Sequence, residues 1–255
     1  IQKKLSMFSI QVAYNPEFIA QGEIVKGLEE SDIVLIGTDY QELANDLIQI
    51  YRKIQTTPVN AHVMSCKAAE ITKIGINCFL TTKISYANMM GDILSKSNLG
   101  NEIDSVLNAI GGDTRVGKKY MKYGFGFGGP CLPRDNRALG HYAKELGMEL
   151  NLPLTVDEFN KEHASFLKNF FIKQNPDKTI PFVMNYITYK RGTDILEESQ
   201  QFKLCLDLLE EGYYLNVIEI DAVSKQLSEL GEQYNGRLKF YKPGTTPEGF
   251  VINLQ

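Results

Sequence analysis

The sequence has 255 residues, which is enough for one large domain or two ordinary ones with a sizeable core. Its formal net charge of −4 argues against non-specific binding to nucleic acid, because such binding depends on an excess of basic residues. No apolar run approaches the roughly 18 residues that cross a membrane, so we expect no membrane span.

The N-terminus, the cysteines and the histidines narrow the class of protein further. Residues 1–5 contain neither a start methionine nor the apolar core of a signal peptide, so we expect the chain to begin partway through a longer protein. The 4 cysteines are widely spaced, and three of them lie in apolar surroundings, where we expect a cysteine to be a small buried apolar residue. The 3 histidines are isolated in the sequence. This pattern predicts no metal site and is typical of a reduced, cytoplasmic protein.

The first 60 residues carry alternating strand and helix signals. Residues 9–14 are predicted to form a short strand, and Pro16 can open a helix at its first turn. Residues 32–37 form a compact apolar strand, and residues 40–54 have the periodicity of a helix. This part of the chain therefore resembles the end of an α/β sheet whose beginning is absent.

Helical patterns dominate the middle of the chain. Residues 66–96 contain no proline and carry apolar residues on several sides, as in a helix that joins domains or subunits. Lys73 and Asn77 stand four residues apart and share one face of this helix, although a lysine among apolar residues is more often a surface residue. Further helices are predicted at residues 101–110, 136–146 and 154–171.

The pattern changes after a polar break at residues 175–178. Strands are predicted at residues 180–187, 214–220 and 238–241, and helices at residues 198–210 and 223–230. Alternation of this kind predicts a small parallel α/β domain at the C-terminus.

A glycine-rich stretch at residues 124–135 contains one cysteine, Cys131, followed four residues later by Asp135. Three of its glycines match the spacing G-x-G-x-x-G of a dinucleotide-binding turn, but that turn requires a strand before it and a helix at its last glycine. The flanking residues predict neither, so we reject this interpretation. The stretch is interpreted either as a surface turn with a structural cysteine or as a backbone cradle for a nucleophilic thiol.

Five segments, taken in order, resemble the motifs of the UDP-glucose/GDP-mannose (nucleotide-sugar) dehydrogenase family. The active-site signature G-F-G-G-S-C-x-x-K-D is similar to residues 126–135, and the motif E-x-x-K-x-x-x-N-x-F is similar to residues 70–79. The other three segments are residues 15–22 (N-P-E-F), 110–117 (I-G-x-D-x-R-I-G) and 189–199 (K-P-x-T-D-D-x-R-E-S).

The resemblance implies an α/β architecture of three parts. Residues 1–62 would be the C-terminal remnant of a Rossmann-like NAD-binding domain, and residues 63–174 a helical central domain with the cysteine loop. Residues 175–255 would be a small Rossmann-like domain that binds the UDP part of the substrate. The long helix at residues 66–96 would form the core of a homodimer.

The resemblance also implies the reaction, a four-electron oxidation of the C6 alcohol of a nucleotide sugar to a carboxylate, with NAD as cofactor. The acid would form through a thiohemiacetal and a thioester on the cysteine. Matching positions give these expected catalytic residues: Cys131 as nucleophile, Asp135 as base or water-orienting group, Lys73 and Asn77 as oxyanion contacts, and Glu17 in thioester hydrolysis. Expected substrate contacts are Glu17, Phe18, Lys73, Asn77, Tyr120, Met121, Gly124, Gly128, Lys190 and, in the partner subunit's site, Arg115.

Several positions depart from the family motifs. Gln21 stands in place of a glutamate, Glu197 in place of an arginine and Arg134 in place of a lysine, and all three positions contact NAD in the family. Pro130 replaces the serine beside the cysteine. We therefore expect intact thiol chemistry with altered cofactor contacts, and little or no activity from this chain alone.

Three alternatives stay open at this point. The first is a non-catalytic module that binds a nucleotide sugar or forms a dimer. The second is the same chemistry on GDP-mannose or a UDP-N-acetylhexosamine instead of UDP-glucose. The third alternative is an unrelated cysteine hydrolase. Such an enzyme requires a histidine close to Cys131, and His141 is the only histidine near Cys131 in the sequence.

Overall fold

A computed structural model describes residues 5, 10–18 and 24–254 of the chain. The chain forms two compact units, residues 1–76 and residues 77–255, and each contains a parallel β-sheet. The fold is therefore α/β, as predicted. The boundary between the units falls inside one long helix, so the expected three-part division at residues 62 and 174 stays a prediction.

The first unit is built on a two-stranded parallel sheet. Its elements are α2 (Ile24–Glu29), β1 (Val34–Gly37), α3 (Gln41–Ile54) and β2 (Ala61–Met64). Strand β1 pairs with β2 from Val34 opposite Ala61 to Gly37 opposite Met64. The apolar face of α3 covers this pair, and Val34, Ile36 and Ala44 form the small core. The predicted strand and helix at residues 32–54 are confirmed, whereas β2 was not predicted.

The predicted strand at residues 9–14 is wrong for the residues that the structure describes. From residue 10 onward only Tyr14 pairs with a strand, through an isolated antiparallel bridge to Gly37. Side chains hold this segment in place of a ladder: Asn15 donates to the Leu35 carbonyl at 2.8 Å, and the Thr38 hydroxyl donates to the Val12 carbonyl at 3.1 Å. No helix begins at Pro16 within residues 15–18.

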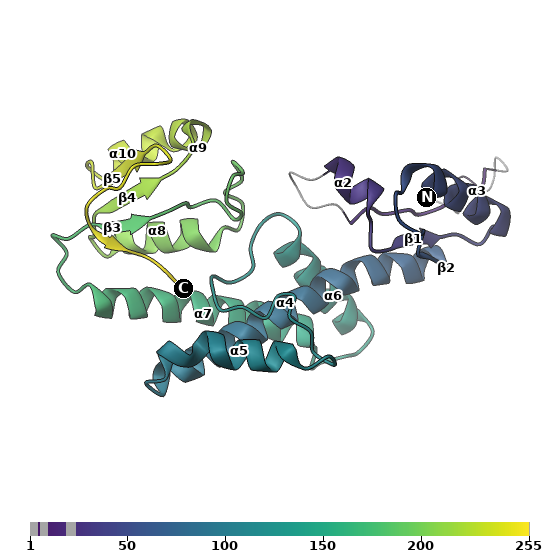
Figure 1. Ribbon diagram of the computed structural model, residues 1–255, viewed down its shortest axis with the longest axis horizontal. Coiled ribbons are helices and arrows are strands. Elements are labelled where there is room, and N and C mark those ends of the chain that lie inside the picture. The colour runs from purple at the N-terminus through teal and green to yellow at the C-terminus, as the bar shows by residue number, and fades with distance from the viewer. Residues whose placement is uncertain (1–4, 6–9, 19–23, 255) are drawn as a thin grey trace. The chain divides into compact units, whose positions relative to one another are not determined.

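Helices dominate the first part of the second unit (Figure 1). The long helix α4 (Cys66–Lys96) has the predicted bounds and is followed by a 3₁₀ turn (Gly100–Glu102) and α5 (Ile103–Gly112). Helices α6 (Leu132–Glu145) and α7 (Leu152–Gln174) pack against each other. An Asn151 side chain caps α7, because its carbonyl oxygen accepts the Leu154 amide at 3.2 Å.

Helix α6 begins four residues earlier than predicted. The sequence contains Pro133, which we expected to stand outside the helix, but proline is favoured in a first helical turn because that turn needs no amide donor. Cys131 is consequently the N-cap residue of α6. A helix therefore does follow the glycine-rich stretch, contrary to the prediction. No strand precedes it in residues 118–123, so the stretch still lacks one of the two elements that a dinucleotide-binding turn requires.

The C-terminal part of the second unit is a four-stranded parallel sheet of order β5-β4-β3-β6, coloured green to yellow in Figure 1. Its elements are β3 (Phe182–Met184), α8 (Gln200–Glu210), β4 (Leu215–Ile218), α9 (Asp221–Gln226), α10 (Ser228–Gln233), β5 (Leu238–Tyr241) and β6 (Phe250–Val251). The predicted parallel domain is confirmed. Three details differ. The strand predicted at residues 180–187 is limited to β3, the predicted helix at residues 223–230 is broken at Leu227, and β6 was not predicted.

A continuous hydrophobic core joins the helices of this unit to its sheet. It includes Leu107, Leu167 and Phe171 from the helices, and Phe182 and Leu215 from the strands. Helix α7 packs against both α6 and α8, so the helical part and the sheet share one interior. Within the described residues no helix combines the length and apolar character needed to cross a membrane.

Candidate functional site

Cys131 is the exposed cysteine of the second unit and stands at the start of α6. Its carbonyl accepts the Asp135 amide at 2.9 Å, which begins the helical hydrogen-bond ladder. The N-terminus of a helix favours negative charge, because its first amides point outward without partners. Cys131 therefore stands at the end of α6 that favours an anionic ligand.

Asp135 lies one helical turn after Cys131 on α6, and its buried carboxylate accepts hydrogen bonds from two side chains. Asn77 donates to one oxygen at 2.7 Å, and Arg134 donates to the other from Nε at 2.9 Å and from Nη2 at 2.9 Å. Only 5% of Asp135 is exposed, whereas the Arg134 side chain is 66% exposed. The Asp135 carboxylate is the main cause that raises the pKa of Arg134 above its usual range, and the charge of Cys131 is a smaller one. Arg134 therefore connects the aspartate to the cysteine.

Cys78 is a structural cysteine next to this group. Its sulfur lies 3.5 Å from the Asp135 carbonyl, and only 5% of the residue is exposed. Burial, reinforced by the negative charge of Asp135, raises the pKa of the Cys78 thiol to about 12. Cys205 is completely buried, so both cysteines behave as the small hydrophobes that we predicted, while Cys66 is half-buried.

Lys73, Glu17 and Phe18 come together in the first unit. The Lys73 ammonium group donates to the Glu17 carbonyl and lies 4.3 Å from the centre of the Phe18 ring, a cation–π distance. Lys73 is one helical turn before Asn77 on α4, as the sequence predicted. Gln21, one of the expected cofactor contacts, lies outside the described residues.

A cavity of about 470 Å³ lies in the second unit between the glycine-rich stretch and the C-terminal sheet. Its lining comprises residues 122–126 of the stretch and, from the sheet part, Met184, Asn185, Tyr186, Tyr189, Arg191, Gln201 and residues 252–254. Lys122 and Arg191 are the charged residues of this lining, and it contains no acidic residue. In the described part of the chain neither cation has a hydrogen-bond or ion-pair partner. The cavity is thus positively charged in a chain of net charge −4.

Tyr189 places the cavity next to Cys131. Its ring lines the cavity and packs against Gly129, where an added Cβ atom would lie 2.5 Å from the ring. Burial and the charge of Cys131 both raise the pKa of the Tyr189 hydroxyl. Gly129 has a φ of +80°, a conformation that side chains disfavour, so both its backbone and its lack of a side chain suit this close contact.

The expected substrate residues are distributed unevenly around this cavity. Gly124 lines it, and Gly128 packs against the Glu198 carbonyl, 2.4 Å from the position of an added Cβ atom. Met121 is a core residue, Tyr120 is exposed with a φ of +66°, and Arg115 is exposed and paired with Asp113 at 2.7 Å. Lys190 and Glu197 are exposed and lie outside the cavity lining.

Of the residues expected to contact the substrate, Gly124 alone lines the cavity, so sequence reasoning missed most of the lining, including both of its cations. The resemblance directed attention to Lys190, but the neighbouring Arg191 lines the cavity and stands where the family motif has proline. Lys122 lies within the stretch before Gly124 and was not singled out. The available signal at Arg191 is its charge, since it places a cation where the family motif has proline, beside a predicted site.

The chain matches two models of one family, as comparison with known proteins shows. Residues 67–162 match the UDP-glucose/GDP-mannose dehydrogenase family central domain, and residues 1–55 match the NAD binding domain of the same family. The chain belongs to the UDP-glucose/GDP-mannose dehydrogenase family.

Individual relatives agree with this family. A UDP-glucose 6-dehydrogenase of Rickettsia bellii is 31% identical over 214 residues, which are 83% of this chain and 49% of that protein. A UDP-glucose 6-dehydrogenase of Bacillus subtilis is 31% identical over 75% of this chain and 42% of its own length. The solved UDP-glucose dehydrogenase of Pyrobaculum islandicum superposes with a TM-score of 0.80 at 27% identity, covering 91% of this chain and 52% of that one. The chain thus spans about half the length of the curated relatives that it matches.

Proposed function

We propose that this chain is the substrate-side part of a dehydrogenase that oxidises the C6 alcohol of a UDP-sugar to a carboxylate, with UDP-glucose as the substrate. The observation that carries the proposal is Tyr189, which lines the positive cavity and also lies beside Cys131. A ligand in the cavity would therefore extend toward an exposed thiol at a helix N-terminus.

The charge of the cavity supports a nucleoside diphosphate as the bound group. Lys122 and Arg191 offer two uncommitted cations, which suit the two negative charges of a diphosphate. The rings of Tyr186 and Tyr189 and the amides of Asn185 and Gln201 offer the flat surface and the paired donors and acceptors that a base requires. This combination favours a nucleotide sugar over a free sugar.

The cysteine accounts for an oxidation that passes the aldehyde stage. The first oxidation removes a proton and a hydride from the C6 alcohol. The Cys131 sulfur then adds to the aldehyde carbon as a thiolate, forming a C–S bond while the carbonyl oxygen becomes an alkoxide. Loss of a second hydride from that carbon leaves a thioester, and water breaks the C–S bond to release the carboxylate and the thiol.

The neighbouring polar residues support these steps. Asn77 and Arg134 both donate to the Asp135 carboxylate, one helical turn after Cys131, and the family resemblance assigns Asp135 to act as a base or to orient water. Lys73 and Glu17 are proposed, by the family resemblance, to stabilise the alkoxide and to orient the water. No histidine among the described residues bonds the Cys131 sulfur, which argues against a cysteine hydrolase.

The described residues meet part of what NAD requires. Sheet β1–β2 ends at Gly37 and Met64, and the carboxyl ends of parallel strands are where α/β sheets bind ligands. The spacing G-x-G-x-x-G occurs in this sequence at Gly124–Gly129 alone, where no strand precedes it, so these residues supply no pyrophosphate turn. NAD, when bound, accepts the two hydrides, and Arg134 stands at a motif position that contacts NAD in the family.

A homodimer through α4 is the second part of the proposal. Phe79, Tyr86 and Ile93 stand seven residues apart on this helix and are 65%, 43% and 48% exposed. Apolar side chains at this spacing form one stripe, which suits packing against a second helix. Sedimentation should show a dimer for the chain and a monomer for the double variant Phe79→Glu and Tyr86→Glu. A monomeric parent chain would contradict this part.

Calorimetric titration with UDP-glucose, GDP-mannose and UDP-N-acetylglucosamine tests the substrate assignment directly, because it requires no NAD. We expect UDP-glucose to bind most tightly. Arg191→Ala and Lys122→Ala should each weaken binding about tenfold, or about 1.4 kcal/mol, by removing one phosphate contact. Lys118→Ala is the matched control outside the cavity. Equal binding by Arg191→Ala and the parent chain, with loss in Lys190→Ala, would refute the assignment of Arg191.

The chemistry is tested in the whole protein with NAD. Cys131→Ser should abolish formation of the acid, because serine cannot form the thioester. Undiminished acid production by this variant would refute the role of the thiol. Tight binding of a UDP-sugar combined with no oxidation in the parent protein would favour the non-catalytic module.

A further inference from the structure

The glycine-rich stretch has a structural requirement that its own sequence cannot meet. Residues 123–128, which we call the glycine loop, contain no helix or strand. Their backbone amides and carbonyls need partners nonetheless, because burying such groups without a hydrogen bond is costly. Side chains from two helices, α4 and α7, provide these partners.

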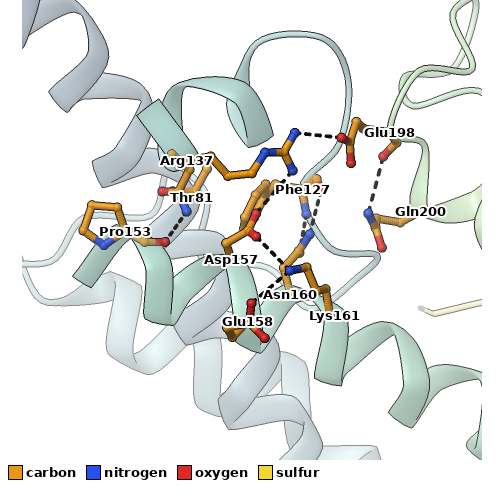
Figure 2. A network of polar contacts seen from close by, with 11 residues as sticks. Thr81, Phe127, Arg137, Pro153, Asp157, Glu158, Asn160, Lys161, Glu198 and Gln200 are labelled. Atoms are coloured by element: carbon orange, nitrogen blue, oxygen red, sulfur yellow. Dashed lines mark hydrogen bonds and ion pairs between the residues drawn. The ribbon is translucent and has the colours of Figure 1, made fainter. Parts of the chain in front are cut away.

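Asn160 of α7 binds the middle of the glycine loop. Its side-chain carbonyl accepts the Phe127 amide at 2.9 Å, and its side-chain NH₂ group donates to the Phe127 carbonyl at 2.9 Å, as Figure 2 shows. One amide thus replaces both hydrogen bonds that a neighbouring strand would supply. Gly126 accommodates this contact, since an added Cβ atom would lie 2.1 Å from the Asn160 oxygen. Asn160 is itself buried, with 6% of its surface exposed.

His163, three residues further along α7, binds the start of the glycine loop. The residue is completely buried, with Nε2 lying 2.8 Å from the Gly124 carbonyl and Nδ1 lying 2.8 Å from the Asp92 carboxylate. Because a carbonyl only accepts, Nε2 must carry a hydrogen. The other Asp92 oxygen accepts the Tyr123 hydroxyl at 2.9 Å. Burial and the charge of Asp92 raise the pKa of Tyr123, so it remains a donor.

Helix α4 completes the attachment. Asn88, which is 1% exposed, accepts the Gly124 amide at 3.0 Å and donates to the Phe125 carbonyl at 3.4 Å. The glycine loop is therefore fixed from both helices at Gly124 and again at Phe127. Residues of the same loop form the wall of the cavity, and Gly128 and Gly129 continue it toward Cys131.

We propose that Asn160 and His163 are positioning residues that hold the glycine loop at the distance from the C-terminal sheet at which the cavity binds its nucleotide sugar. They touch the loop backbone and are absent from the cavity lining, so they act through the loop. The part of this inference that concerns ligand affinity rests on the proposed function. The part that concerns the loop does not.

The test compares two buried asparagines, one that hydrogen-bonds the glycine loop and one that hydrogen-bonds a backbone carbonyl elsewhere. Asn160→Ala removes both bonds to Phe127, and Asn160→Asp keeps the acceptor for the Phe127 amide but loses the donor. Asn175→Ala is the matched control, because Asn175 is also buried, at 3% exposure, and donates to the Ile180 carbonyl at 3.1 Å, a residue outside the loop and the cavity lining. His163→Gln tests the second anchor, since glutamine can still donate to Gly124.

Two readouts are measured on each variant of this chain, namely hydrogen exchange of the amides at residues 124–129 and the Kd for UDP-glucose. We expect Asn160→Ala to speed exchange and to raise the Kd, each at least tenfold, with Asn160→Asp intermediate. The control should lower Tm comparably and change neither readout. Should Asn160→Ala fail to fold, the same comparison is made with Asn160→Asp.

The outcomes separate the two proposals. Parent-like loop exchange and a parent-like Kd in the Asn160 variants would overturn the positioning role. If the parent chain binds none of the nucleotide sugars, the proposed function fails, and the exchange rates still decide whether Asn160 holds the loop. Faster exchange with an unchanged Kd would overturn the link between the loop and affinity.

Discussion

Gly129→Ala tests the contact on which the candidate site depends. Gly129 combines a φ of +80° with a Tyr189 ring so close that an added Cβ atom would lie 2.5 Å from Cδ2 and 2.7 Å from Cε2. Gly117 has a similar φ of +76° but no atom within 4 Å of an added Cβ atom. The two glycines therefore separate the cost of the backbone conformation from the cost of the steric overlap.

The expected magnitude follows from these two terms. An alanine in the left-handed conformation costs about 1–2 kcal/mol, which is the whole effect expected for Gly117→Ala. Overpacking against the Tyr189 ring adds about 1–3 kcal/mol, because the ring must move or the backbone must shift. Gly129→Ala should therefore lower the free energy of unfolding by about 2–5 kcal/mol.

Chemical denaturation followed by circular dichroism measures both variants, and a double-mutant cycle isolates the overlap. Tyr189→Ala removes the ring, so Gly129→Ala should cost about 1–3 kcal/mol less in that background than in the parent chain. Equal costs for Gly129→Ala and Gly117→Ala would refute the reasoning. A zero coupling energy with Tyr189 would do the same, and it would remove the link between the cavity and Cys131.

Three further predictions concern single side chains of the second unit. Asn77→Leu removes the hydrogen bond that Asn77 donates to Asp135 at 2.7 Å, so Tm should fall and the free energy of unfolding should decrease by about 1–3 kcal/mol. An unchanged Tm would contradict a role of this hydrogen bond in stability. Burial raises the pKa of the Cys205 thiol from 9.0 to about 12, so the folded chain binds the thiol proton more tightly than the unfolded chain does. The free energy of unfolding should therefore fall as pH rises from 9 to 12, and more steeply than in Cys205→Ala. Parallel denaturation profiles of those two chains would show this sign to be wrong. Arg137→Met breaks the half-exposed 2.8 Å pair with Glu198 and a 3.6 Å pair with Asp157, both drawn in Figure 2. Asp157 keeps Lys161 at 3.1 Å, so the loss should stay below about 1 kcal/mol, and a larger loss would contradict this reasoning.

Element types were largely readable from the chain, because they depend on local periodicity. The apolar pattern of residues 66–96 predicted α4 with its observed bounds, and the alternation beyond residue 175 predicted the parallel C-terminal sheet. Short elements were harder. Strand β6 has two residues, Phe250 and Val251, which carry no recognisable pattern and pair only because β3 is adjacent.

Residues 9–14 show why a local pattern can fail. Their composition suits a strand, but a strand needs a partner along its length, and in the described residues this segment meets β1 only at Gly37. Side-chain bonds from Asn15 and Thr38 satisfy the backbone there instead. Such a choice between ladder and side chain depends on neighbours that are distant in sequence.

The sequence by itself determined the family and the candidate thiol of this protein, because the motif around Cys131 depends on residue types at short spacing. Only the tertiary structure decided which residues form the cavity wall. Arg191 lines the cavity in place of Lys190, and His163 and Asn160 bind a loop that lies more than 30 residues earlier in the chain. Burial, direction and hydrogen-bond pairing across such distances depend on how helices and sheet pack, and no local pattern encodes them.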